Sequence, residues 1–162
     1  MVTVGTVQAG VRYNIIPPDA TLSGTIRAFS PATQEKIWAA IKRTAAGIAA
    51  ANGATAEVTI EPYVPVTFND PALTARMLPT MQRAAGPANV VEIKAVTGAE
   101  DFACYQEKIP GLFIFLGGMT PGTDPATVAD HHTAGFQVDE SAFPLGVKTL
   151  ATLAADYLVN DK

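Results

Sequence analysis

The chain has 162 residues, of which 48% are apolar and 16% charged, so it can bury a core and is not an intrinsically disordered protein. Its formal net charge is −4 and its basic residues are scattered, which argues against nucleic acid or an anionic membrane as a partner. Its single cysteine, Cys104, cannot form an internal disulfide, residues 1–10 lack the pattern of a secretory signal peptide, and no apolar run is long enough to cross a bilayer. We therefore expect a cytoplasmic protein in a reducing compartment.

The N-terminal segment predicts two strands, a helix and a third strand. Residues 2–7 hold three valines with Thr and Gly between them, which is typical of a strand, and residues 20–29 alternate apolar with polar side chains, as a half-buried strand does. The Ser-Pro pair at residues 30–31 predicts a helix start, and apolar residues at the 3.6 spacing of a buried face continue it to Asn52. Residues 54–61 alternate again. This segment is typical of part of a small α/β sandwich.

The remainder of the chain follows a proline-containing run and alternates helix with strand. The elements predicted here are a helix over residues 70–86, strands over residues 90–93 and 111–116, a short helix after residue 101, and a helix over residues 141–158. The apolar strand at 111–116 suits a position covered on both faces. Residues 117–135 have no regular pattern, and a loop that long inside a compact domain is usually functional or mobile. We expect a domain boundary near residues 63–69 in an overall α/β fold.

The two histidines, His131 and His132, lie side by side in this patternless stretch. Adjacent side chains in an extended loop point in roughly opposite directions, so the two imidazoles are not expected to share one metal ion. One can bind a metal while the other packs or forms hydrogen bonds. A solvated loop without any ligand is the alternative.

Glu100 and Asp101 follow a tight turn at Gly98 and begin a helix. They are either favourable charges at a helix N-terminus or a carboxylate pair that positions a metal ligand or a substrate group.

Three further polar residues have simple structural explanations. Asn14 precedes an apolar pair and can cap its own turn, Arg27 lies on the polar face of a strand and can be solvated, and Cys104 is expected to be a buried, inert thiol. The sequence has no Gly-x-Ser-x-Gly elbow and no P-loop. Two histidines and scattered carboxylates do not complete a dinuclear hydrolase site, which needs about five protein ligands and a general base.

Four segments, taken together, carry a resemblance to a known family. The pattern is similar to that of the hippurate hydrolases and N-acyl-amino-acid amidohydrolases (aminoacylases), a group of metal-dependent amidohydrolases and carboxypeptidases. The segments occur in the family's order and spacing: VGTVQAGVRYNIIPPDATLSGTIRAF, FNDPALT, TGAEDFACYQEKIPGLFIFLGG and HHTAGFQVDESAFPLGVKTL.

The resemblance implies a fold and an assembly. Residues 1–66 would form part of a lid and dimerisation domain, an incomplete ferredoxin-like sandwich, and residues 67–162 the C-terminal part of a zinc-peptidase-like catalytic domain. The family's Cys-Gly-His-Asp metal motif and Glu-Glu base pair do not occur in this sequence. An unpaired lid edge predicts a homodimer or higher oligomer.

The resemblance also implies a role for individual residues. His132 matches the family's last metal ligand, although Ala134 stands where the family usually has proline. The metal would be zinc, manganese or cobalt, and the substrate an N-acyl amino acid or a peptide. The residues that match the family's substrate side are Asn14, Gly98, Glu100, Asp101 and His131.

The function that follows is that of a C-terminal portion of a metal-dependent amidohydrolase. In the family, a glutamate deprotonates a metal-bound water that attacks the amide carbonyl. We expect the 162-residue chain to have no amidase activity alone and to bind metal weakly or not at all. A non-catalytic dimerisation or binding module is the alternative, and complementation by a second chain is a third possibility.

Overall fold

The computed structural model describes residues 1–159 and contains one two-stranded sheet and several helices. This mixture confirms the predicted α/β class. The strands and longer helices are β1 (Val2–Ala9), β2 (Ala20–Ile26), α1 (Pro31–Ala51), α2 (Pro71–Ala85), α3 (Phe102–Gln106) and α4 (Phe143–Val159). Three short 3-10 helices complete the order: η1 (Pro87–Asn89), η2 (Pro125–Thr127) and η3 (Glu140–Ala142).

The chain divides into two compact units. The first comprises Met1–Thr67 with Ala95–Glu107, and the second comprises Phe68–Lys94 with the residues from Lys108 onward. The segment that holds α3 groups with the first unit, although it follows the boundary expected near residues 63–69. That the units correspond to a lid and a catalytic portion stays a prediction.

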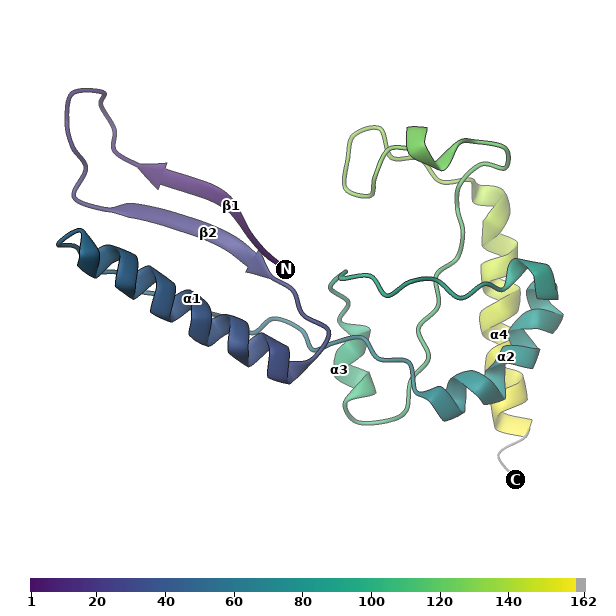
Figure 1. Ribbon diagram of the computed structural model, residues 1–162. Helices are drawn as coiled ribbons and strands as arrows, with labels where there is room; N and C mark the ends of the chain where they lie inside the picture. Colours follow the sequence, from purple (N-terminus) through teal and green to yellow (C-terminus); the bar gives the residue numbers. More distant parts are fainter. Residues whose placement is uncertain (160–162) are drawn as a thin grey trace. The chain divides into compact units, whose positions relative to one another are not determined.

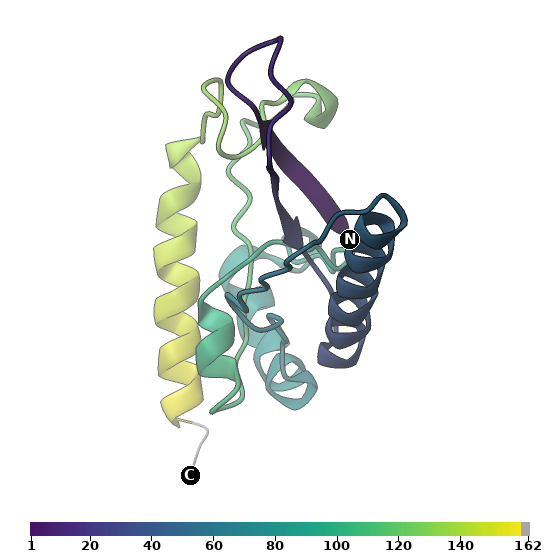
Figure 2. The same ribbon diagram turned by 90° about the vertical axis from the view of Figure 1, so that its left-hand side faces the viewer.

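The first unit is built on the antiparallel pair β1–β2. The register runs from Val2 opposite Ile26 to Ala9 opposite Ala20, with a bulge between Val4 and Thr6. A side chain at Gly24 would collide with the backbone of the opposite strand, so only glycine fits there. The loop between the two strands extends well beyond them (Figures 1 and 2).

Helix α1 runs beside the β1–β2 ribbon (Figure 1). Its start is as predicted, since the Ser30 hydroxyl accepts a hydrogen bond from Thr33 N–H at 3.2 Å, and its end is marked by Asn52, whose side chain donates to Ile48 O at 2.8 Å. The predicted buried face is wrong for this structure. No residue of α1 is buried, and Ile48 is 63% exposed. Helix α1 packs closely on no other helix or strand of residues 1–159, so its apolar face stays open.

The second unit holds the buried side chains of α2 and α4. Asp70 caps α2 as predicted, accepting a hydrogen bond from Leu73 N–H at 2.7 Å. The buried residues are Met77, Thr80, Met81 and Ala84 of α2 and Thr149 of α4. These residues form the small core of the unit, because α2 packs on α4.

Polar contacts reinforce the packing of α2 on α4. Thr80 Oγ1 donates to Asp156 Oδ2 at 2.6 Å, and Arg83 forms an ion pair with the same carboxylate. Lys148 Nζ donates to Ala84 O at 2.8 Å. These groups bind at several points along the two helices and therefore fix how one lies on the other.

The strands predicted at residues 54–61, 90–93 and 111–116 are wrong, since the sheet of the described chain contains only β1 and β2. A strand exists only where its backbone meets a neighbouring strand, and alternation alone does not supply that neighbour. The expectation that residues 111–116 are covered on both faces is also wrong, because Phe115 is exposed.

At residues 111–116, a side-chain amide forms backbone hydrogen bonds of the kind that a neighbouring strand would form. Phe113 N–H donates to Asn69 Oδ1 at 2.7 Å, and Asn69 Nδ2 donates to Phe113 O at 2.8 Å. Asp70 N–H also donates to Gly111 O at 3.0 Å. The apolar segment is thereby tied to the start of α2.

No helix among residues 1–159 is long and apolar enough to span a membrane.

Candidate functional site

The histidine pair lies on a loop of the second unit whose ends are held together. Asp139 N–H donates to Gly118 O at 2.7 Å, which closes the segment between them. A Cβ atom at Gly118 would lie 2.5 Å from the Val138 side chain, so the close approach of the two ends requires glycine there. The histidines are thus carried on a closed loop rather than on a helix or strand.

His132 has an unusual backbone conformation. Its φ is +66°, and among residues 1–159 it is the one residue other than glycine with a positive φ. The surrounding turn is held by Thr133 Oγ1, which donates to Asp130 O at 2.7 Å, and by Phe136 N–H, which donates to Thr133 O at 3.1 Å. Left-handed residues other than glycine cost conformational energy and cluster at functional sites, which supports a functional hypothesis for His132.

The two imidazoles have different surroundings. The ring of His131 lies 4.4 Å from the ring of Phe136, centroid to centroid, whereas the rings of His131 and His132 are 6.4 Å apart. Both histidines are exposed. The structure therefore shows one histidine packed on an aromatic ring and the other at the left-handed position of the turn.

Asp139, at the end of the loop, has a pKa below the ordinary value of an aspartate, because the side chain and the backbone N–H of Ser141 both form hydrogen bonds with its carboxylate. The backbone bond is 2.9 Å long. Since the pKa is lowered in the folded chain, this contact stabilises the fold at pH values above the pKa of the unfolded chain. The stabilisation is lost as the pH falls through the pKa of the folded chain.

Removing the Ser141 hydroxyl is expected to raise the Asp139 pKa toward its ordinary value. The Ser141→Ala chain should show this in a carbon NMR titration of the Asp139 carboxyl group. Ser141→Thr keeps the hydroxyl and should titrate like the natural chain. An Asp139 midpoint that is identical in all three chains would contradict the assigned cause.

Gly98, Glu100 and Asp101 lie in the first unit, at the start of α3. Glu100 Oε1 accepts a hydrogen bond from Phe102 N–H at 3.3 Å, which is the contact expected of an acidic residue at a helix start. Asp101 is exposed and makes no side-chain capping bond to α3. The sequence did not distinguish the two carboxylates, whereas in the structure Glu100 accepts a bond at the helix start and Asp101 makes no such bond.

The other polar residues of the first unit lie in distinct places. Asn14 is exposed in the loop between β1 and β2. Cys104 is also exposed, so the expected buried thiol is wrong, because five-residue α3 buries only Ala103. Arg27 is half-buried and its guanidinium donates to the carbonyl oxygen of Thr97. A solvated Arg27 is therefore also wrong, and no local sequence signal points to a partner 70 residues away.

No group of three His, Cys, Asp or Glu side chains among residues 1–159 lies close enough together to hold a metal ion. The described residues on their own therefore do not fit the two-metal centre that the family resemblance implies.

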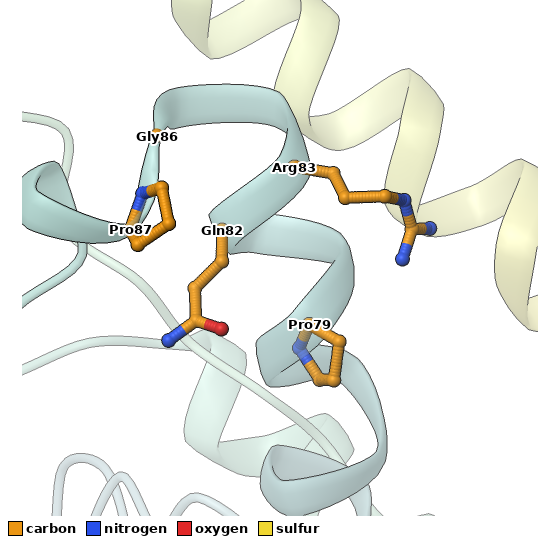
Figure 3. Close-up of a pocket in the computed structure, with 5 residues that line it drawn as sticks. All are labelled: Pro79, Gln82, Arg83, Gly86 and Pro87. Carbon is orange, nitrogen blue, oxygen red and sulfur yellow. The ribbon is translucent and has the colours of Figure 1, made fainter.

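One open hollow lies at the C-terminal end of α2, lined by Pro79, Gln82, Arg83, Gly86 and Pro87 (Figure 3). The guanidinium of Arg83 extends toward α4, where it pairs with Asp156. None of the predicted site residues lines this hollow, and it is not the candidate site.

Comparison with known proteins defines the class of this chain. Residues 2–156 match the model of peptidase family M20/M25/M40. The chain belongs to this family, and the resemblance stated from the sequence is confirmed.

Three proteins that are similar to this chain carry more specific descriptions than the family does. The chain is 36% identical to N-acetylcysteine deacetylase of Bacillus subtilis, over 95% of this chain and 38% of the relative. It is 33% identical to thermostable carboxypeptidase 2 of Saccharolobus solfataricus, over 97% of this chain and 39% of the relative. The crystal structure of the YXEP protein of Bacillus subtilis, described as a dinuclear metal-binding peptidase of the M20 family, matches with a TM-score of 0.77 and 35% identity, over 98% of this chain and 42% of that one. The chain thus spans about two-fifths of the length of these proteins.

Proposed function

We propose that this chain is the C-terminal portion of a metal-dependent hydrolase that cleaves the amide bond of N-acyl amino acids. The observation that carries the proposal is the family match over residues 2–156. It is supported by relatives named for deacetylation of an N-acetyl amino acid and for carboxypeptidase activity, and by a neighbour described as binding two metals. The reaction releases an acyl group and an amino acid.

In this proposal His132 is a metal ligand, with zinc, manganese or cobalt as the metal. Its left-handed backbone and its position on a closed loop support that role, because both restrict where the imidazole can lie. Residues 1–66 would belong to the lid and residues 67–162 to the catalytic domain. The residues assigned to the substrate side are Asn14, Gly98, Glu100, Asp101 and His131.

The 162-residue chain by itself is expected to show no amidase activity. Two histidines cannot complete a dinuclear site, and the general base would be supplied by residues outside this chain. An assay with N-acyl amino acids and added zinc, manganese or cobalt measures this directly. Turnover above background that disappears in the His132→Ala chain would show that the active site is complete here, and the proposed division of the site would be wrong.

A second role, self-association, is favoured by the exposed β1–β2 ribbon. Val7 and Leu22 face each other in the register and are 66% and 62% exposed. Unpaired edges and apolar strand faces of this kind bind other chains. We expect a homodimer or higher oligomer in light scattering coupled to size-exclusion chromatography, and a shift toward monomer for Val7→Lys. A monodisperse monomer of the natural chain would contradict this role.

We also propose that the protein works in the cytoplasm and binds neither nucleic acid nor membranes. The lone Cys104 and the net charge of −4 support this setting. Recovery of the native protein in a secreted or membrane fraction, or retention on a nucleic-acid column at physiological salt, would contradict it.

A further inference from the structure

Arg27 connects the end of the β1–β2 ribbon to the turn that precedes α3. Its backbone is fixed from both sides, since Arg27 N–H donates to Met1 O at 2.9 Å and the Met1 amino group donates to Arg27 O at 2.6 Å. Its guanidinium Nη1 donates to the carbonyl oxygen of Thr97. The ribbon and the turn are thereby joined by one side chain across 70 positions of sequence.

The chemistry of both partners suits a fixed contact. A guanidinium is always charged and carries five donors in a planar fork, so it can hold a carbonyl oxygen with little loss of freedom once its stem is ordered. Arg27 and Thr97 are both half-buried, where losing a hydrogen-bond partner costs more than at the open surface.

The position of Thr97 decides what the contact controls. A Cβ atom placed on the next residue, Gly98, would have no neighbouring atom within 4 Å, so no packing contact holds the turn at this position. Three residues after Thr97, Glu100 O accepts from Ala103 N–H at 3.2 Å and begins α3. The turn is therefore held at its far end by α3 and at its near end by Arg27.

We propose that Arg27 is a positioning residue, which holds the Thr97 carbonyl so that the Gly98–Asp101 turn keeps one conformation. The consequence for catalysis rests on the proposed function, in which this turn lies on the substrate side. The contact itself does not depend on that function, and the two can be tested separately.

The direct test is the carbonyl carbon resonance of Thr97 in this 16.9 kDa chain. Arg27→Gln is expected to move it, Arg27→Lys to retain part of the natural shift because one cationic donor remains, and Arg12→Gln to leave it unchanged. Arg12 is the matched control, since it is an exposed arginine of the β1–β2 loop. An unchanged Thr97 resonance in Arg27→Gln would overturn the proposal.

Hydrogen exchange separates local positioning from general stability. Arg27→Gln should accelerate exchange of the amides of residues 98–106 by about tenfold, the size expected for one charged hydrogen bond, while amides of α1 keep their natural rates. Equal acceleration in α1 would show a merely structural role and would also overturn the proposal. If the Thr97 resonance moves as expected while no amidase can be built from this chain, the positioning role stands and the proposed function fails.

Discussion

Replacing His132 by alanine is expected to lower the kcat/KM of a complete enzyme by at least about 100-fold, because even the residues that merely support metal ligands are worth 10- to 100-fold. The enzyme for this test joins the part of the YXEP protein that this chain does not match to residues 1–162. The physical reason lies in the loop, where His132 occupies the left-handed position of a turn closed by Asp139 and Gly118. Steady-state kinetics and metal content per chain are the two measurements, and both should fall.

His131→Ala is the matched control for that variant. His131 is the adjacent residue of the same type, but its ring packs on Phe136 at 4.4 Å. Its replacement should lower kcat/KM less than that of His132 and should leave the metal content unchanged. Equal losses of metal in the two variants, or a larger loss for His131, would contradict the assignment of His132 as the ligand.

Met77→Ala is expected to lower the free energy of unfolding by about 2–3 kcal/mol, at the lower end of the range for buried methionine. Met77 is 4% exposed on the face of α2 that packs on α4, in a core of few residues. Truncation would leave a cavity that the polar contacts of Thr80 and Lys148 prevent from collapsing fully. Urea unfolding followed by circular dichroism at 222 nm measures the loss.

Leu78→Ala separates core packing from a general effect of shortening an α2 side chain. Leu78 is the next residue and is 38% exposed. Its truncation should cost clearly less than that of Met77, since less apolar surface returns to water. Equal costs would show that the face of α2 identified as buried does not form the core of this unit.

Local signals predicted the helices well. Ser30 and Asp70 are recognisable as caps because each is followed by proline and a periodic apolar stretch, and both accept the expected bond from a backbone N–H. The pair β1–β2 is also recognisable, because a valine-containing segment and an alternating segment flank a proline break. These features depend on residues a few positions apart, which a single sequence shows.

Features that depend on distant residues could not be predicted in the same way. Residues 54–61 and 111–116 have strand-like composition, but forming a strand depends on a neighbouring strand, and the composition does not specify one. The contact of Arg27 with Thr97 joins positions with no common local pattern.

The histidine loop has features of both kinds, some that local sequence predicts and some that depend on distant residues. Its length predicted a functional or mobile segment, and the family resemblance singled out His132. The cap that Asp139 provides to η3 was within reach of the sequence, since an aspartate two residues before Ser141 is a usual helix cap, whereas the bond from Asp139 N–H to Gly118 O joins distant residues and was not. The positive φ of His132 could not be predicted from the sequence, because that angle depends on how the whole turn is held.

We propose that this chain completes a metal-dependent amidohydrolase, and the turnover of N-acetylcysteine by the joined enzyme tests that proposal most directly. We predict measurable hydrolysis that stops when the metal is removed by chelation and returns when zinc, manganese or cobalt is restored. A folded joined enzyme that hydrolyses no N-acyl amino acid, or whose hydrolysis is unaffected by chelation, would contradict the account.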